Sequence, residues 1–348
     1  MKCLSLFSGI GGFDLALQRQ GHEIIGACEI DKYARQVYAR HFPGITIHND
    51  ARTLSPESLP YFDMLCGGFP CQAFSVAGKR KGFDDTRGTL FFEIARIARE
   101  KKPRYLLLEN VRGILSHDKG ETFRTILATL DEIGYDAEWQ IINSKYFVPQ
   151  NRERIFIIGH LRGERTRQIF PLGDCGELDN NSRPETQEEG KRISGTIDSN
   201  YWKGGSRTMI AEPEIKYENM SESQANRVYN IDGIAPSLGV GHAMNTPNIT
   251  VPVLTPDRLE KRQNGRRFKE NGDPSFTLTS QDIHDIFDGK RIRRLTPVEC
   301  ERLQGFPDNY TDGLSDTQRY KCLGNAVTVP VVEYILSFFA LQSFRSGK

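Results

Sequence analysis

Residues 4–12, Leu-Ser-Leu-Phe-Ser-Gly-Ile-Gly-Gly, join a short apolar run to a loop with three glycines. Helical spacing follows from Phe13 to Gln20, and Gly21 ends that pattern. A second apolar run, residues 24–28, stops at Glu29. Glycines let a backbone approach a ligand closely, and a carboxylate after the next strand can accept hydrogen bonds from ribose hydroxyls. This stretch therefore predicts a strand, loop, helix and strand that bind a nucleoside cofactor.

Apolar runs and helical patterns keep alternating up to about residue 160. Apolar runs lie at residues 45–47, 63–66, 105–108, 137–142 and 154–159, and helical spacing occupies residues 90–100 and 121–133. Such alternation predicts an α/β fold with a doubly wound, mostly parallel sheet. Ligands of these sheets bind outside the carboxyl ends of the strands. The glycine loop, Glu29, Asp50, Cys71 and Glu109 are all expected at that edge.

The pattern changes after about residue 162. Residues 174–191 are polar, and residues 196–290 hold short apolar runs, many glycines and no long helical pattern. A capping box at Thr296-Pro297-Val298-Glu299 then predicts a short helix, and an apolar helix is expected at residues 331–341. We therefore expect an α/β domain over residues 1–164, a smaller β-rich domain over 165–290, and a segment 291–348 that returns to the first domain.

Composition is that of a water-soluble globular chain. Lys and Arg number 46 and Asp and Glu 45, so the net charge of +1 does not indicate a nucleic-acid partner. Residues 258–294 are locally basic, with ten Lys or Arg against six Asp or Glu, which suits either a solvated face or a phosphate-contacting edge. No apolar run approaches the roughly 18 residues of a membrane span, and no signal-peptide pattern is found.

Cysteine usage points to a reducing compartment. The seven cysteines form no CxxC pair and lie near no histidine cluster, which argues against a disulfide framework and against a metal site. Cys71 stands apart, because it follows an apolar run and the stiff pair Phe69-Pro70. From these residues alone, Cys71 can be a nucleophile or a buried structural thiol.

Six segments together resemble the motifs of bacterial DNA (cytosine-5)-methyltransferases, in the order of that family. They are Phe7-Ser8-Gly9-Ile10-Gly11-Gly12, Gly68-Phe69-Pro70-Cys71-Gln72, Glu109-Asn110-Val111, Gln150-Asn151-Arg152-Glu153-Arg154, Arg294-Leu295-Thr296-Pro297 with Gln304-Gly305-Phe306-Pro307, and Gly324-Asn325. The resemblance implies a class I S-adenosylmethionine-dependent methyltransferase fold. Residues 1–164 would then be the catalytic domain and residues 165–290 the variable target-recognition domain.

The resemblance also implies a mechanism. Cys71 would add to C6 of cytosine and make C5 reactive toward the methyl group. Glu109 would hydrogen-bond N3 and the exocyclic amine, while Arg154 and Arg152 hold the base and order the site. The target base would be flipped out of the duplex, and residues 72–88 would close over the DNA.

The family's cofactor contacts transfer to matching positions. The cofactor is S-adenosyl-L-methionine, and Ile30 stands where many relatives carry a bulkier aromatic residue, so adenine packing there is expected to be apolar contact. The expected cofactor-binding residues are Phe7, Gly9, Ile10, Gly11, Gly12, Glu29, Ile30, Asp50, Ala51, Pro70, Leu90, Asn325 and Ala326.

The resemblance implies a cytoplasmic monomer that acts on double-stranded DNA, in a restriction–modification system with a possible endonuclease partner. Three other functions stay open from the sequence. They are an RNA cytosine methyltransferase of the same fold, a catalytically silent DNA-binding relative, and a nicotinamide-dependent oxidoreductase, the last supported by the glycine loop alone.

Overall fold

The structure is a computed structural model, which describes residues 1–70, 90–164, 166, 168–170, 172, 195–196, 251–254, 269, 273–279, 284–287 and 292–340. The chain forms two compact units. The first contains Met1–Ile142, Glu153–Ile215 and Val331–Lys348, and the second contains Asn143–Arg152 and Lys216–Pro330. The division into segments 1–164, 165–290 and 291–348 stays a prediction.

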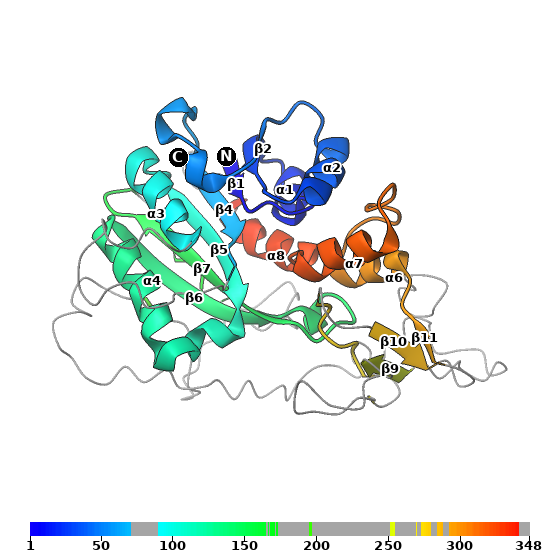
Figure 1. Ribbon diagram of the computed structural model, residues 1–348. Helices are drawn as coiled ribbons and strands as arrows, with labels where there is room; N and C mark the ends of the chain where they lie inside the picture. Colours follow the sequence, from blue (N-terminus) through cyan, green and yellow to red (C-terminus); the bar gives the residue numbers. More distant parts are fainter. Residues whose placement is uncertain are drawn as a thin grey trace. The chain divides into compact units, whose positions relative to one another are not determined.

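A mixed, mostly parallel sheet forms the centre of the first unit (Figure 1). Its strand order is β3-β2-β1-β4-β5-β7-β6-β8, and the pairs among β3, β2, β1, β4 and β5 are parallel. Strand β7 is antiparallel to β5. The predicted fold class is confirmed. The strands are β1 (Lys2–Leu6), β2 (Glu23–Cys28), β3 (Ile47–His48), β4 (Met64–Gly68), β5 (Tyr105–Val111), β6 (Tyr135–Asn143), β7 (Glu153–Leu161) and β8 (Gly195–Thr196).

Both faces of this sheet are buried, which explains the nearly continuous apolar runs. Leu4 and Leu6 share one apolar cluster with α3 (Leu90–Lys101) and α4 (Glu121–Glu132), which cover that face. Successive residues of a strand point to opposite faces. Accordingly Tyr105, next to the clustered Leu106, packs edge-on against Phe339 of α8 (Val329–Ala340), with ring centroids 5.0 Å apart.

Two helices follow the first two strands. Helix α1 (Gly12–Arg19) begins after Gly11, and α2 (Lys32–His41) begins at the N-cap Asp31, whose side chain accepts from Tyr33 N at 2.8 Å. Helix α2 was not expected from the sequence. The described 3-10 turns are η1 (Ala51–Thr53), η2 (Pro56–Ser58), η4 (Arg112–Leu115), η5 (His117–Gly120) and η6 (Ser144–Tyr146).

The second unit contains an antiparallel sheet and two helices. Its strands are β9 (Val251–Leu254), β10 (His284–Phe287) and β11 (Ile292–Arg294), and its helices are α6 (Pro297–Gln304) and α7 (Asp316–Asn325). The predicted capping box is confirmed, because Thr296 Oγ1 accepts from Glu299 N and Glu299 accepts from Thr296 N.

Although polar residues such as Glu333 and Ser337 interrupt its apolar residues, the helical stretch Asp316–Phe339 contains an 18-residue window with a mean hydropathy of 1.5, enough by length and composition for a membrane span. Two thirds of that window (67%) is buried inside the protein, as in the core helices of many globular folds.

An ionisable group lies inside the core beneath the glycine loop. Asp14, in the first turn of α1, is fully buried. Burial raises the pKa of its carboxyl to about 7, although the hydroxyls of Ser5 and Tyr38 act in the opposite direction. The folded protein therefore holds a proton that the unfolded chain releases near pH 4.

Asp14→Asn should change how stability depends on pH. Because the folded-state pKa is raised, the wild-type free energy of unfolding should fall as pH rises from about 4 to 7. Between pH 5 and 8 this amounts to about 2–3 kcal/mol, at 1.36 kcal/mol per unit. Urea unfolding at both pH values should show the loss in wild type and in the exposed control Glu132→Gln, but not in Asp14→Asn. Equal pH slopes in all three proteins would contradict the assignment.

Candidate active site

Parallel pairing brings five chain segments to one edge of the sheet. Strands β1, β2, β3, β4 and β5 run in the same direction, so their carboxyl ends lie together. Phe7, Glu29 and Asp50 follow the ends of β1, β2 and β3, while Glu109 lies near the end of β5. Strand β4 ends at Gly68, and Cys71 comes three residues later, outside the described residues.

The loop after β1 has an unusual backbone. Phe7 has a φ of 54°, a conformation that costs a bulky residue of the order of 1–2 kcal/mol. Gly11 has a φ of 89°, and a Cβ there would lie 2.4 Å from the Phe42 ring. A Cβ on Gly9 would meet no described atom within 4 Å, so the loop is open beside this glycine. The loop is thus strained and partly open, as is common at ligand sites.

Glu29 connects this loop to the next turn. Its Oε2 accepts from Gly9 N at 2.8 Å and its Oε1 from Asp31 N at 2.7 Å. Each carboxylate oxygen has a second lone pair, which leaves acceptor capacity for ligand hydroxyls. The neighbouring Ile30 is 64% exposed, which is unusual for a large apolar side chain. Together they offer a polar acceptor beside an apolar surface.

The carboxylate of Asp50 is held by the side chain of Arg52, which lies two residues further along the same turn. Arg52 Nε and Nη2 donate to the Asp50 carboxylate at 2.6–3.1 Å, and these hydrogen bonds lower the pKa of that carboxyl. Ala51 is buried at the start of η1. Arg96 of α3 donates from Nη2 to Ala51 O and Leu54 O, both at 2.9 Å. Sequence reasoning missed Arg96, because its 45-residue separation from Ala51 gives no local signal.

Glu109 forms an ion pair at the same edge. Arg154 Nε lies 2.9 Å from Glu109 Oε1, and the side chains are only 15% and 12% exposed, respectively. The antiparallel pairing of β5 and β7 creates this contact, since Arg154 faces Val111 and Phe156 faces Glu109 in the register. The structure thus joins two of the residues that the sequence analysis assigned to one site.

Gly68 lies directly beside this pair. It is the register partner of Glu109, and a Cβ at this position would lie 2.8 Å from Glu109 Oε2. A Cβ on Gly67 would lie 2.1 Å from Leu6 O, so both glycines allow close approach of the strand ends. The sequence places Gly68 in the Gly68-Phe69-Pro70-Cys71-Gln72 motif but does not predict this contact with Glu109.

Gly68→Ala should move the Glu109 carboxylate while leaving the fold intact. Because Arg154 holds that carboxylate, it cannot swing away freely, and we expect kcat of the methyl transfer that the family resemblance implies to fall between about 10- and 100-fold. Initial rates of that transfer at saturating substrates would measure this. Gly113→Ala is the matched control, since a Cβ there meets no described atom within 4 Å. An unchanged kcat in Gly68→Ala would contradict the proposed contact.

Asn110 holds the segment that leads toward Cys71. Its buried amide donates from Nδ2 to Phe69 O at 2.8 Å, and its Oδ1 accepts from Val111 N at 2.8 Å. Phe69 is buried against Phe91 of α3, with ring centroids 5.4 Å apart. Pro70 is exposed and Leu90 is half-buried. The expected lid, residues 72–88, lies outside the described residues.

Arg152 is an internal residue of the second unit. It is 2% exposed and donates to three backbone carbonyls, Leu278 O at 2.7 Å, Gly324 O at 3.3 Å and Ala326 O at 2.8 Å. Two of these acceptors flank Asn325, which is exposed at the end of α7. Arg152 therefore fixes the backbone on both sides of an expected cofactor contact.

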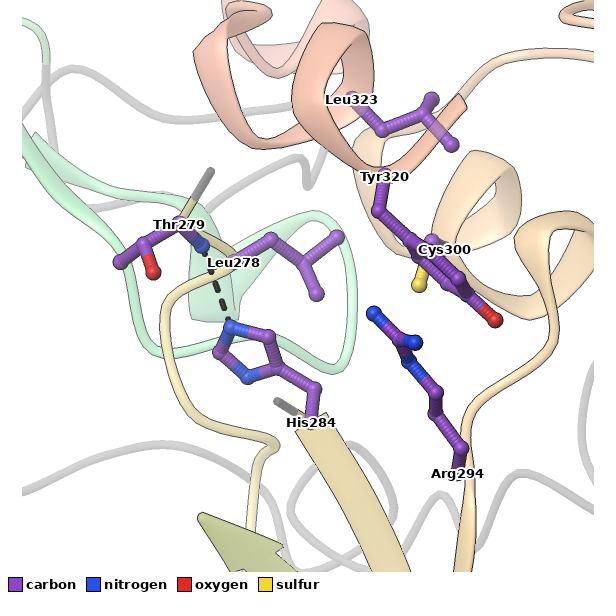
Figure 2. Close-up of a pocket in the computed structure, with 7 residues that line it drawn as sticks. All are labelled: Leu278, Thr279, His284, Arg294, Cys300, Tyr320 and Leu323. Atoms are coloured by element: carbon purple, nitrogen blue, oxygen red, sulfur yellow. Dashed lines mark hydrogen bonds between the residues drawn. The ribbon is translucent and has the colours of Figure 1, made fainter. Parts of the chain in front are cut away.

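The motif residue Arg294 lines a pocket of the second unit. Figure 2 shows its lining, in which the Arg294 guanidinium carbon lies 3.9 Å from the centre of the Tyr320 ring. Thr279 N donates to His284 Nε2 at 3.2 Å, and Tyr320 OH donates to Leu295 O at 2.6 Å. Burial raises the pKa of the Cys300 thiol in this pocket to about 12. The pocket thus contains a fixed arginine–tyrosine stack and a protonated thiol.

The described cysteines are poor candidates for a nucleophile. Cys3, Cys28, Cys66, Cys300 and Cys322 are all buried. Burial raises the pKa of Cys3, Cys28 and Cys300 to about 12 and that of Cys66 well above its ordinary value. A thiol must ionise to attack. Cys71 and Cys175, outside the described residues, are the other two.

The matching family, the relatives and the solved structures found by comparison are all methyltransferases. Residues 1–339 match the family described as C-5 cytosine-specific DNA methylase. The chain is 35% identical to the orphan methyltransferase M.SPRI of Bacillus phage SPR, with 96% of each chain covered. It is 36% identical to the type II methyltransferase M.HpaII of Haemophilus parainfluenzae, covering 95% of this chain and 86% of that protein. The solved S. pombe Dnmt2 methyltransferase has a similar fold, with a TM-score of 0.59, 19% identity and 99% of each chain covered.

Proposed function

Because this chain belongs to the C-5 cytosine-specific DNA methylase family, we propose that it methylates C5 of a flipped-out cytosine in a specific double-stranded DNA sequence. The observation that carries the proposal is the Glu109–Arg154 ion pair at the carboxyl edge of the sheet. This pair lies beside the end of β4, from which the chain continues to Cys71.

Cys71 is the proposed nucleophile. Its thiolate adds to C6 of cytosine, which places electron density on C5. C5 would then take the methyl group as the S–CH3 bond of the sulfonium donor breaks and a neutral thioether leaves. A base would remove the C5 proton, and elimination across C5–C6 would release the thiolate. The raised pKa values of four buried cysteines support this choice, because those thiols stay protonated near neutral pH.

Glu109 stabilises the charge that develops on the ring. Its carboxyl group would hydrogen-bond N3 and the exocyclic amine, while Arg154 fixes the carboxyl orientation. Arg152 was expected to act in catalysis as well. With its guanidinium buried on three carbonyls, it would act through the backbone that it holds, as a positioning residue.

The glycine loop and its neighbours fit S-adenosyl-L-methionine, which supplies an electrophilic methyl group on sulfur. Gly9, Gly11 and Gly12, together with Phe7 and Ile10, would surround the donor, and Glu29 would accept hydrogen bonds from the ribose hydroxyls. The exposed Ile30 would pack against the adenine, beside Asp50 and Ala51. Pro70, Leu90, Asn325 and Ala326 stay proposed contacts.

The test is methylation of a defined plasmid, followed by bisulfite sequencing. The expected result is protection of cytosines within one short sequence, only when S-adenosyl-L-methionine is present. A parallel assay with labelled cofactor should favour duplex DNA over transfer RNA. Label transferred to transfer RNA alone would contradict the DNA assignment, and cofactor binding without turnover on either substrate would indicate a silent relative. Binding of a nicotinamide nucleotide in place of S-adenosyl-L-methionine would indicate an oxidoreductase.

The names of the relatives suggest two biological settings for the proposed activity. Their names include type II methyltransferases and orphan methyltransferases. We propose that this protein modifies cytoplasmic DNA as a monomer, and that a restriction endonuclease with the same recognition sequence is its counterpart. A nuclease that cuts the unmodified plasmid and spares the modified one would support this setting.

A further inference from the structure

Two turns that carry proposed cofactor contacts are each held by an arginine of a neighbouring helix. Arg35 of α2 donates from Nη1 to Glu29 O at 2.9 Å and to Ile30 O at 2.6 Å. Arg96 of α3 donates from Nη2 to Ala51 O and Leu54 O, both at 2.9 Å. In each case one charged nitrogen bridges two carbonyls of the same turn.

Such a bridge fixes the backbone from which a binding side chain projects. Charge-assisted hydrogen bonds are roughly twice as strong as neutral ones. Arg35 holds the carbonyls of Glu29 and Ile30 themselves. Arg96 holds Ala51, which follows Asp50, and is itself held by Glu93 Oε2 at 2.8 Å. The orientation of three proposed contacts thus depends on two residues outside the site.

These arginines are not needed to form the turns. The Glu29 turn is also closed by Asp31 N, which donates to the Glu29 carboxylate, and by the Asp31 N-cap. The η1 turn has its own hydrogen bonds from Arg52 N to Asp50 Oδ1 at 3.0 Å and from Leu54 N to Ala51 O at 3.3 Å. Arg96 also stays 34% exposed. Removing either guanidinium should loosen the turn rather than unfold the protein.

We propose that Arg35 and Arg96 are positioning residues for the adenosine half of the cofactor. The inference rests on the proposed use of S-adenosyl-L-methionine. Both arginines contribute to the affinity for the cofactor and neither takes part in the chemical step, because they hold the backbone of Glu29, Ile30 and Ala51.

The experiment compares Arg96→Ala, Arg96→Lys and Arg35→Ala with wild type by titration calorimetry. Two probes are used, S-adenosyl-L-methionine and 5′-methylthioadenosine, which keeps the adenosine half and lacks the amino-acid half. Each alanine variant should raise Kd about tenfold for both probes, as expected for losing hydrogen bonds to a charged donor. Arg96→Lys should restore part of the affinity, since an ammonium can still donate to the carbonyls. At saturating cofactor, kcat should stay within about twofold of wild type.

Lys101→Ala is the matched control. Like Arg96, Lys101 lies on α3. It donates to the carbonyl of Leu59 at 2.5 Å, which belongs to neither of the turns held by Arg35 and Arg96. Its variant should keep wild-type Kd for both probes, and thermal melting without cofactor should show that all variants are folded.

Three results would overturn the inference. They are wild-type Kd values in the folded alanine variants, a fall in kcat at saturating cofactor that equals the change in Kd, or the same loss in Lys101→Ala. Failure of the wild-type protein to bind S-adenosyl-L-methionine would instead overturn the proposed function, and the premise of the inference with it.

Discussion

Cys71→Ser is expected to methylate duplex DNA at least about 10⁴-fold more slowly than wild type, as for other enzymes that lose their nucleophile. A serine hydroxyl stays protonated near neutral pH and adds poorly to C6, whereas a thiol can be activated as the thiolate. Methyl transfer from labelled cofactor to a plasmid would measure the rate.

A trapping assay separates loss of the nucleophile from loss of folding. With 5-fluorocytosine at the target, fluorine on C5 cannot leave as a proton does, so the covalent adduct should persist in denaturant. Wild type and Cys175→Ser should form this adduct, and Cys71→Ser should not. An adduct in Cys71→Ser, or its loss in Cys175→Ser, would reject Cys71 as the nucleophile.

Glu109→Gln should lower kcat about 10³-fold, with little change in the KM for cofactor. The amide keeps the size of the side chain, but it cannot form the ion pair with Arg154 and cannot transfer a proton to N3 as the ring gains electron density. Single-turnover methylation at saturating DNA would report the chemical step.

Glu153→Gln provides a control with the same chemistry. Glu153 also pairs with an arginine, Arg112 at 2.8 Å, but its side chain is 40% exposed. Solvent-exposed ion pairs contribute little free energy, so the Glu153→Gln variant should keep the wild-type methylation rate. Comparable losses in the two variants would show that the effect is not specific to Glu109.

The α/β fold could be predicted because its strands are buried on both faces. Apolar runs such as Tyr105-Leu106-Leu107-Leu108 are continuous, and the strands end at glycines or acidic residues. Helix α2 escaped prediction because its sequence, Lys32-Tyr33-Ala34-Arg35-Gln36, is largely polar. Its start signal was nevertheless present in Asp31, which caps the helix.

The candidate site was predicted residue by residue, but its contacts were not. The pairing of Glu109 with Arg154 requires the register between β5 and β7, which lie some 45 residues apart in the chain. The same holds for Gly68 beside Glu109 and for Arg96 on the Ala51 carbonyl. Local patterns indicate which residues end a strand, whereas tertiary packing decides which of them meet.

The parallel pairing of β1 with β4 restricts how this protein can diverge. One strand leads into the glycine loop and the other toward Cys71, and Leu4 pairs with Leu65. A one-residue insertion in either strand would shift one loop past the other by about 3.3 Å and turn its following side chains to the opposite face. Selection can therefore exchange residues in β1 and β4 but cannot readily change their length, so the sheet fixes the distance between the start of the glycine loop and the end of β4.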